Sequence, residues 1–222
     1  MKTVSIVSLK GGAGKTTVAV NLALVGHLAG WRVMLADCDP QGSATLCLKA
    51  RAASGPLVRP VNLGTLFQDG VLAERAGVEL RVIDTPPGPK GDVVACINAA
   101  DACLVVCRPT FLDVASALKT AQLLSQLGRP GAIVLNQASP PRGRVQPPAV
   151  KRALEAIALT GLPVAAILSS RVAWQRSLET GRSGIETSPE VCEGETRDLW
   201  AATVQLLAHA TPRRTGPERL RA

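Results

Sequence analysis

The feature that most constrains this chain is a glycine-rich octet close to its start. Residues 4 to 9 form an apolar, strand-like run that breaks into Lys10-Gly11-Gly12-Ala13-Gly14-Lys15-Thr16-Thr17, and a helical pattern follows. Because glycine adopts positive φ angles and leaves room for close approach, the N–H groups of such a turn can point at phosphate oxygens. The octet therefore predicts a phosphate-binding loop between a strand and a helix, with the positive end of the helix beside the anion.

Two side chains of the octet have predicted roles of their own. Lys15 is placed to pair with the β- and γ-phosphates of a nucleotide and the Thr16 hydroxyl to ligate Mg²⁺, as the spacing G-x-x-x-x-G-K-[ST] requires. That spacing asks for a glycine where this chain has Leu9, so a chance glycine-rich turn stays open as the alternative. The expected nucleotide-binding residues are Gly11, Gly12, Ala13, Gly14, Lys15, Thr16 and Thr17.

Acidic residues follow two further strand-like runs. Residues 32 to 36 lead to Asp37-Cys38-Asp39-Pro40, and residues 80 to 83 close on Asp84. Carboxylates at the carboxyl edge of a parallel sheet lie near the phosphate crevice, where they can order a water or a metal shell. We expect Asp84 to hold Mg²⁺ directly or through water, and Asp37 to support Mg²⁺ and the loop beside it. The alternative for Asp39-Pro40 is a plain turn.

The octet K-G-G-x-G-K-T-T resembles the deviant Walker A motif of the ParA/MinD family of P-loop ATPases. The resemblance implies that ATP is the nucleotide and that Lys10 reaches across a dimer interface to the nucleotide of the other subunit. It also implies that Asp39 activates water, since Asp37 to Gln41 is similar to the family's D-x-D-P-Q segment. The catalytic set expected on this basis is Lys10, Lys15, Asp39 and Asp84.

The resemblance extends along most of residues 2 to 210. Residues 108 to 114 look like the P-x-x-x-D segment of small plasmid-type ParA proteins, and residues 168 to 173 look like their late strand-to-helix junction. It implies that Asn136, at the end of a predicted strand over residues 132 to 135, hydrogen-bonds adenine. An amide can offer a donor and an acceptor to a base edge, and an asparagine that caps a turn is the open alternative.

Strand-like and helix-like runs alternate throughout, which predicts an α/β fold with a doubly wound, mostly parallel β-sheet flanked by helices. With 222 residues, 46% of them hydrophobic, the chain is long enough for one well-buried domain. We expect this domain over residues 1 to 210 and a basic, flexible tail over residues 211 to 222. No apolar stretch approaches the roughly 20 residues of a membrane span, and the start does not resemble a signal peptide, so we expect a cytoplasmic protein. The DNA binding expected below would make it nucleoid-associated.

The formal net charge of +8 and pI of about 9.6 point to a polyanionic partner. Basic residues gather in the C-terminal half, both between residues 140 and 152 and around a predicted helix that starts near residue 172. The candidate DNA-binding residues are Arg142, Arg144, Lys151, Arg152, Arg171, Arg176 and Arg182. Such residues bind phosphates without reading base sequence, although any single one can also be a solvated surface arginine.

These features lead to the hypothesis of a DNA-partition ATPase. An ATP-bound sandwich homodimer would bind DNA non-specifically, and a small ParB-like, centromere-binding adaptor would stimulate slow hydrolysis and release it. The ParF-like resemblance, without an N-terminal extension, favours such an adaptor.

Other functions stay open. A MinD-like membrane-positioning ATPase is disfavoured because the tail lacks an apolar face, and we expect no membrane partner. A ParA-like ATPase that positions another cargo is hardly separable from DNA partition by sequence. An iron–sulfur protein would need a glycine-flanked cysteine, a tyrosine kinase would need tyrosines that this chain lacks, and a dethiobiotin-synthetase-like ligase fits the Asp-Pro-Gln segment poorly.

Overall fold

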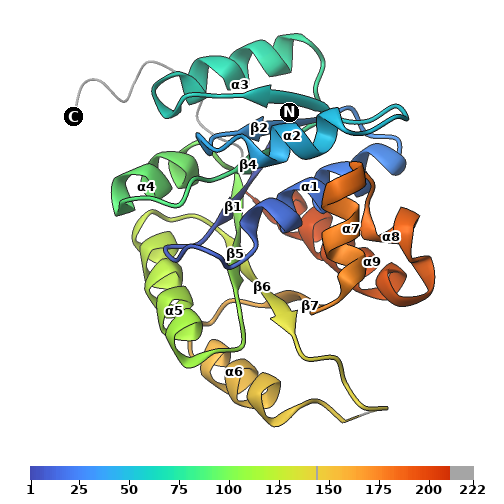
Figure 1. Ribbon diagram of the computed structural model, residues 1–222. Helices are drawn as coiled ribbons and strands as arrows, with labels where there is room; N and C mark the ends of the chain where they lie inside the picture. Colours follow the sequence, from blue (N-terminus) through green and yellow to red (C-terminus); the bar gives the residue numbers. More distant parts are fainter. Residues whose placement is uncertain (144, 211–222) are drawn as a thin grey trace.

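The computed structural model describes residues 1–143 and 145–210. Within these residues the chain forms seven β-strands, nine α-helices and one short 3₁₀ helix (Figure 1). In chain order they are β1 (Lys2–Val7), α1 (Lys15–Leu28), β2 (Val33–Asp37), α2 (Ser43–Lys49), β3 (Leu57–Pro60), η1 (Leu63–Thr65), α3 (Leu66–Arg75), β4 (Leu80–Asp84), α4 (Lys90–Asn98), β5 (Ala102–Cys107), α5 (Phe111–Gln126), β6 (Gly131–Ala138), α6 (Pro148–Ala158), β7 (Val164–Ser169), α7 (Val172–Thr180), α8 (Gly184–Thr187) and α9 (Pro189–His209).

The strands pair into one sheet in the order β3-β2-β4-β1-β5-β6-β7, and every neighbouring pair is parallel. The predicted doubly wound parallel sheet is therefore confirmed. The inner strands are buried on both faces, which explains why they read as continuous apolar runs. The register sets Asp37 at the end of β2 directly beside Asp84 at the end of β4, so the two acidic segments meet at one edge.

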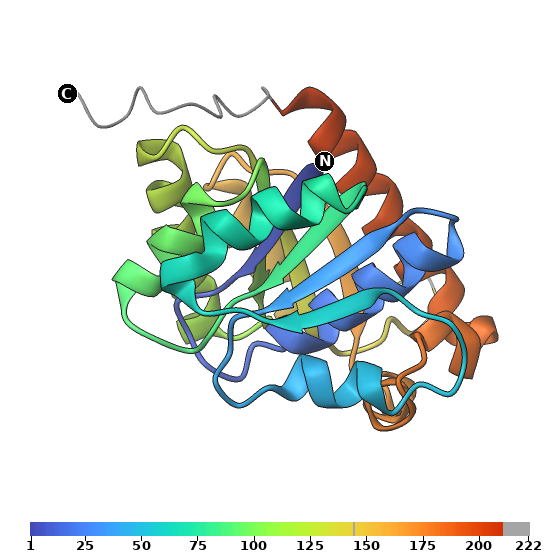
Figure 2. The same ribbon diagram turned by 90° about the horizontal axis from the view of Figure 1, so that it is seen from above.

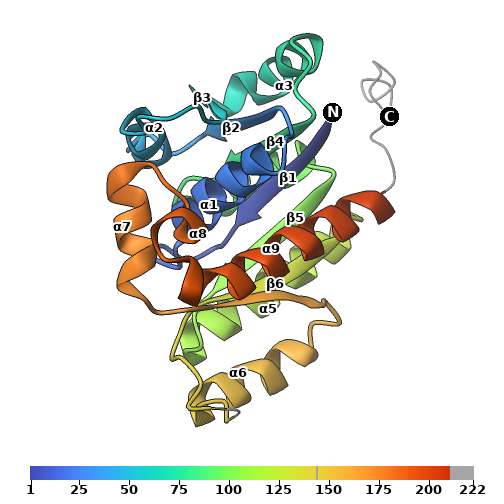
Figure 3. The same ribbon diagram turned by 90° about the vertical axis from the view of Figure 1, so that its right-hand side faces the viewer.

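Helices cover both faces of the sheet. One face packs against α1, α2, α7 and α9, with the side chains of α1 buried almost all round; Figure 3 shows α9 lying over this face beside α1. The other face packs against α4, α5 and α6, with α3 over the β2–β4 side, and Figure 2 shows α3 and α9 on opposite sides of the sheet. The connections after β1 and β4 leave on opposite faces, which opens a crevice at the carboxyl ends of these strands.

Several boundaries differ from the sequence-based expectation. The segment between β2 and β4 contains the edge strand β3, which the sequence analysis does not predict and whose side chains are mostly exposed. Strand β6 continues past residue 135 to Ala138, through a register shift at which Gln137 takes a left-handed φ of 54°. The predicted tail 211–222 and Arg144 lie outside the described residues.

Candidate nucleotide-binding site

The glycine-rich loop connects β1 to α1 at the carboxyl edge of the sheet. Gly14 immediately precedes α1 with a φ of 90°, a left-handed conformation that costs glycine little. A Cβ added at Gly14 would lie 2.1 Å from Nδ2 of Asn136, so space as well as conformation requires glycine there. Among the described residues, no side chain caps the first turn of α1, and no acidic residue lies in that turn. The N–H groups at the start of this helix can therefore bind an anion.

Lys15 lies inside the crevice. Only 7% of the residue is exposed. Burial lowers the pKa of its ammonium group, while the negative charges of Asp84 and Asp39 act in the opposite direction. The predicted phosphate lysine and two of the predicted carboxylates therefore share one electrostatic environment.

Asp84 is completely buried, and neither of its carboxylate oxygens has a hydrogen-bond partner within the described part of the chain. Burial raises its pKa to about 7; the nearby Thr16 hydroxyl lowers it, and the charge of Asp37 raises it further. Thr16 thus faces this carboxylate without meeting hydrogen-bond geometry. A buried and unpartnered carboxylate is a group that a bound cation would satisfy.

The donor set fits Mg²⁺ in particular. Magnesium beside a nucleotide takes one or two protein oxygens and completes its shell with water and phosphate, and Thr16 and Asp84 supply such oxygens. Among residues 1–143 and 145–210, no three His, Cys, Asp or Glu side chains cluster as a larger metal site.

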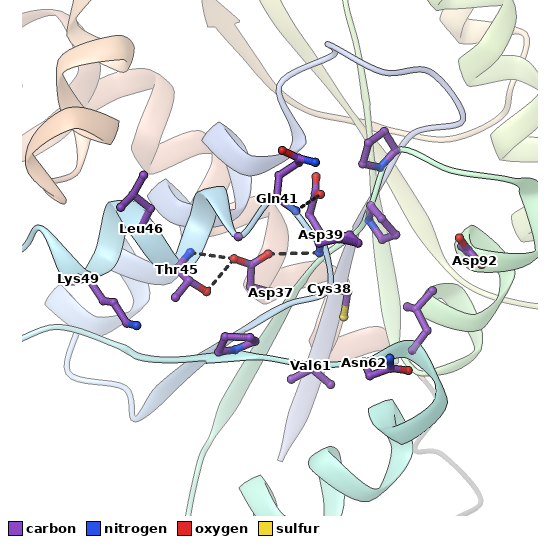
Figure 4. A pocket seen from close by; sticks show the side chains of 16 residues that line it. Asp37, Cys38, Asp39, Gln41, Thr45, Leu46, Lys49, Val61, Asn62 and Asp92 are labelled. Atoms are coloured by element: carbon purple, nitrogen blue, oxygen red, sulfur yellow. Dashed lines mark hydrogen bonds between the residues drawn. The ribbon is translucent and has the colours of Figure 1, made fainter.

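The side chain of Asp37 fastens the loop that runs from Asp37 to Asp39 to the helix that follows it. One carboxylate oxygen of Asp37 accepts hydrogen bonds from the backbone N–H of Thr45 at 2.8 Å and from its hydroxyl at 2.7 Å, and the other accepts from the N–H of Asp39 at 3.2 Å (Figure 4). Asp37 is 2% exposed. These contacts tie the loop to the start of α2, which is the loop-supporting part of the role expected for Asp37, and its contact with Mg²⁺ stays a prediction.

Asp39 lies on the rim of a cavity of about 820 Å³ that extends from the loop to β3. Its Oδ1 accepts a hydrogen bond from the N–H of Gln41 at 2.9 Å, and the residue is half-buried. Figure 4 shows Asp37 and Asp39 on the same loop and Asp92 on the opposite side of the cavity. The geometry leaves Asp39 open to solvent, as water activation requires, and that role stays a prediction.

The side chain of Lys10 forms an ion pair at the start of α5. Its Nζ lies 3.0 Å from Oδ2 of Asp113, at the start of α5, and its side chain is 34% exposed. Sequence reasoning identified the P-x-x-x-D segment that contains Asp113 but not this ion pair.

Asn136 is buried, and its Nδ2 donates to the carbonyl of Ala13 in the glycine-rich loop at 2.8 Å. The residue therefore fastens the loop to β6, and its contact with a base stays a prediction. A cavity of about 200 Å³ adjoins it, lined by Thr17, Gln137, Arg171, Trp174 and others from β7 and α7. Sequence reasoning missed Gln137 and Trp174, whose buried Nε1 has no partner in the described residues.

The candidate DNA-binding residues lie on two faces. Lys151 and Arg152 are exposed on α6, and Arg176 is exposed on α7 on the opposite face of the sheet (Figures 1 and 3). The others are Arg142, exposed in the loop before α6, and Arg182, exposed after α7.

Arg171 differs from the rest because its guanidinium pairs with Glu195 of α9 at 3.1 Å. The sequence alone did not indicate this acidic partner. Tertiary packing therefore weakens the case for Arg171, whose contact with DNA stays a prediction.

A comparison with known families matches residues 4–185 to the CobQ/CobB/MinD/ParA nucleotide-binding domain. In the described residues, no helix is both long and apolar enough to cross a membrane.

Among curated proteins, the chain is 39% identical over 122 residues to the maintenance of carboxysome distribution protein A of Gloeobacter kilaueensis, a match covering 54% of this chain and 55% of that protein. It is 47% identical over 55 residues to the chromosome-partitioning ATPase Soj of Thermus thermophilus, covering 25% of this chain and 22% of that protein. The chain thus matches about half of the first relative and less of the second.

Solved structures resemble the whole fold. An ATP complex of McdA from Cyanothece superposes with a TM-score of 0.73 at 23% identity, covering 92% of this chain and 96% of that chain. The cell division ATPase MinD of Pyrococcus furiosus superposes with a TM-score of 0.74 at 20% identity, covering 92% and 99%. At such identities the likeness establishes the fold.

Proposed function

Because the chain belongs to the CobQ/CobB/MinD/ParA family of nucleotide-binding proteins, we propose that it is an ATPase of the ParA type that positions a cellular cargo. One observation carries the proposal: a buried Lys15 at the end of the glycine-rich loop interacts electrostatically with the buried Asp84, whose carboxylate has no hydrogen-bond partner among residues 1–143 and 145–210. A phosphate chain with its cation would satisfy both groups at once, since the phosphate would offset the burial of the lysine charge and the cation would bind a carboxylate that has no donor in the described residues.

Each site residue then has a defined task. Lys15 and the loop N–H groups bind the phosphates, and Thr16 and Asp84 hold Mg²⁺, which when bound shields the phosphate charge. Asp39 orients the attacking water on a loop that Asp37 fixes through Thr45. The remaining proposed contacts are Asn136 with adenine and Lys10 with the nucleotide of a second protomer.

The ATP-bound dimer is proposed to bind DNA without sequence preference. Exposed cations on α6 and α7 support this step, because a positively charged surface attracts phosphates whatever the base sequence. Hydrolysis, stimulated by a small adaptor protein, would return the protein to a state with lower DNA affinity. The nucleotide thereby acts as a switch, and the protein would associate with the nucleoid while ATP is bound.

Two cargoes are supported by different observations. The resemblance of the P-loop and of residues 108 to 114 to small plasmid-type ParA proteins supports DNA partition. The match to a carboxysome distribution protein supports a protein cargo. We favour DNA partition as the proposal and keep protein positioning as the second candidate.

Binding of random-sequence duplex DNA tests the shared step. We expect tight binding with ATP or a non-hydrolysable analogue and much weaker binding with ADP or without nucleotide. In each state that binds, the slope of log K against log salt should be about −0.9 for every phosphate that the protein neutralises. Lys15→Ala, which cannot hold the phosphates, is the negative control. Binding that is equal in every nucleotide state would refute the switch.

A second experiment separates the cargoes. The gene is deleted in the native host. If the plasmid is then lost more often than in the parent strain, DNA partition is supported. If the plasmid is retained normally and a protein body is mislocalised, the second candidate is supported. Co-sedimentation with anionic vesicles in ATP, and not with DNA, would instead favour a MinD-like protein.

A further inference from the structure

The start of α5 binds the first lysine of the glycine-rich loop. Lys10 Nζ donates to Oδ2 of Asp113 at 3.0 Å, across 103 residues of sequence. Thr110 caps α5 by accepting from the N–H of Asp113 at 3.3 Å, and its hydroxyl also donates to Oδ2 of Asp113. The carboxylate is thus fixed in place before the lysine reaches it.

A second cation shares the same carboxylate. Arg108 donates from Nε to Oδ1 of Asp113 at 3.2 Å and from one terminal nitrogen to Oδ2 at 3.3 Å. Burial raises the pKa of Asp113, but hydrogen bonds from Thr110, Lys10 and Arg108 outweigh it, so its pKa lies below the usual range. The group that faces Lys10 is therefore a charged one at neutral pH.

The two partners of the ion pair differ in burial. The Asp113 side chain is 1% exposed, whereas that of Lys10 is 34% exposed. If Lys10 leaves, Asp113 keeps Arg108 as its counter-charge, so no buried charge is left without a partner. Lys10 can therefore dissociate from this site at a modest cost.

We propose that Asp113 is an intramolecular acceptor that competes with the partner's nucleotide for the ammonium group of Lys10, and so sets the affinity of ATP-dependent self-association. We call the Lys10–Asp113 pair the latch. The proposal rests on the proposed function in one respect, the role of Lys10 across a dimer interface. Asp113 is in these terms a positioning residue, which acts through Lys10 and touches no nucleotide.

Two variants change the latch in opposite directions. Asp113→Asn removes the charge that holds Lys10 and keeps an acceptor for Arg108, so dimers formed with a non-hydrolysable ATP analogue should become at least about fivefold tighter. Arg108→Gln removes the second cation from Asp113, so that Lys10 becomes its only cationic partner among the described residues. Lys10 should then be held more strongly, and these dimers should weaken. Thr110→Ser is the matched control: it keeps the hydroxyl that caps α5 and donates to Asp113, and should leave dimer affinity within about twofold.

The latch itself is measured without nucleotide. An amine-reactive acetylating ester, followed by mass spectrometry, should label Lys10 several-fold faster in Asp113→Asn than in the wild type, with exposed Lys119 labelled equally in both. Sedimentation equilibrium gives the dimer affinity, and it should not respond to Asp113→Asn when Lys10→Ala is already present. If Asp113→Asn fails to fold, Arg108→Gln provides the test instead: its Lys10 should be labelled more slowly than in the wild type, and its dimers should be weaker.

The outcomes separate the two proposals. Unchanged labelling of Lys10 in Asp113→Asn would overturn the latch, because Asp113 would then not hold Lys10. Weaker dimers in this variant would also overturn it, because Asp113 would then support the active position of Lys10. Faster labelling in a protein that never dimerises with the analogue supports the latch as a contact but overturns its effect on assembly, together with the proposed role of Lys10.

Discussion

Replacing Asp84 by asparagine should stabilise the protein at neutral pH when metal and nucleotide are absent. The carboxylate is fully buried, and both oxygens lack a hydrogen-bond partner in the described residues. Ionising such a group in the folded state is costly, because it loses its water and gains no compensating donor. The variant carries no charge and escapes that cost.

The magnitude follows from the pKa. Burial raises the pKa of Asp84 from 3.8 to about 7, and at ~1.4 kcal/mol per unit the ionised carboxylate destabilises the folded state by about 4 kcal/mol. The folded protein holds this proton more tightly than the unfolded chain, so the free energy of unfolding of the wild type falls as pH rises from about 4 to about 7. The advantage of Asp84→Asn is expected near zero at pH 4 and largest above pH 7.

Urea unfolding in EDTA, at intervals between pH 4.5 and 8, measures this difference. Asp113→Asn is a useful control of opposite sign: the pKa of Asp113 is lowered by its donors, so this variant should be less stable than the wild type at pH 7, and the deficit should disappear as pH falls. A pH-independent difference between Asp84→Asn and the wild type would refute the reasoning, as would a less stable variant at pH 8. Mg²⁺ with ATP should stabilise the wild type and not Asp84→Asn.

Three further variants test the proposed site. Lys15→Ala removes the buried counter-charge of the phosphates and should weaken ATP binding at least about hundredfold, as measured by isothermal titration calorimetry; near-normal affinity would place the phosphates elsewhere. Asp39→Ala should keep ATP binding and lose most hydrolysis in a phosphate-release assay, with persistent DNA binding, and normal turnover would remove Asp39 from the mechanism. The pair Arg176→Glu and Arg182→Glu should weaken DNA binding and reduce its salt dependence, whereas Arg197→Glu on α9, which disrupts only an exposed pair with Glu193, should change DNA binding little.

The sequence predicted the parts of the site that depend on local chemistry. The glycines of the loop, a lysine at the start of the helix and an acidic residue at the end of a buried strand are adjacent in sequence to the elements that position them. Lys15, Asp37 and Asp84 could therefore be placed at one sheet edge in advance. Strand β3 could not be predicted, because its four residues are mostly exposed and do not form the alternation or the apolar run of a buried strand.

Contacts between residues that are far apart in the chain could not be predicted from the sequence either. Lys10 meets Asp113 only because β1 and β5 are neighbours in the sheet, and no local pattern encodes that register. The same holds for Arg171, which gains Glu195 from α9, and for the amide of Asn136, which binds the carbonyl of Ala13. In each case the polar group finds a partner on an element whose packing is fixed by the apolar core.

The distribution of exposed cations gives the proposed switch a measurable form. Lys151 and Arg152 on α6 and Arg176 and Arg182 around α7 lie on opposite faces of the sheet, so one protomer offers about two of them to a duplex at a time. Two protomers joined by ATP offer about four, and the slope of log K against log salt should then change from about −2 to about −4. The nucleotide would therefore change the slope of log K against log salt as well as the DNA affinity. The reason is that assembly would double the number of phosphates contacted, while the surface of each protomer would stay the same. A nucleotide that rearranged the surface of a single protomer would change the affinity without requiring this doubling, and the slope separates these two forms of the switch.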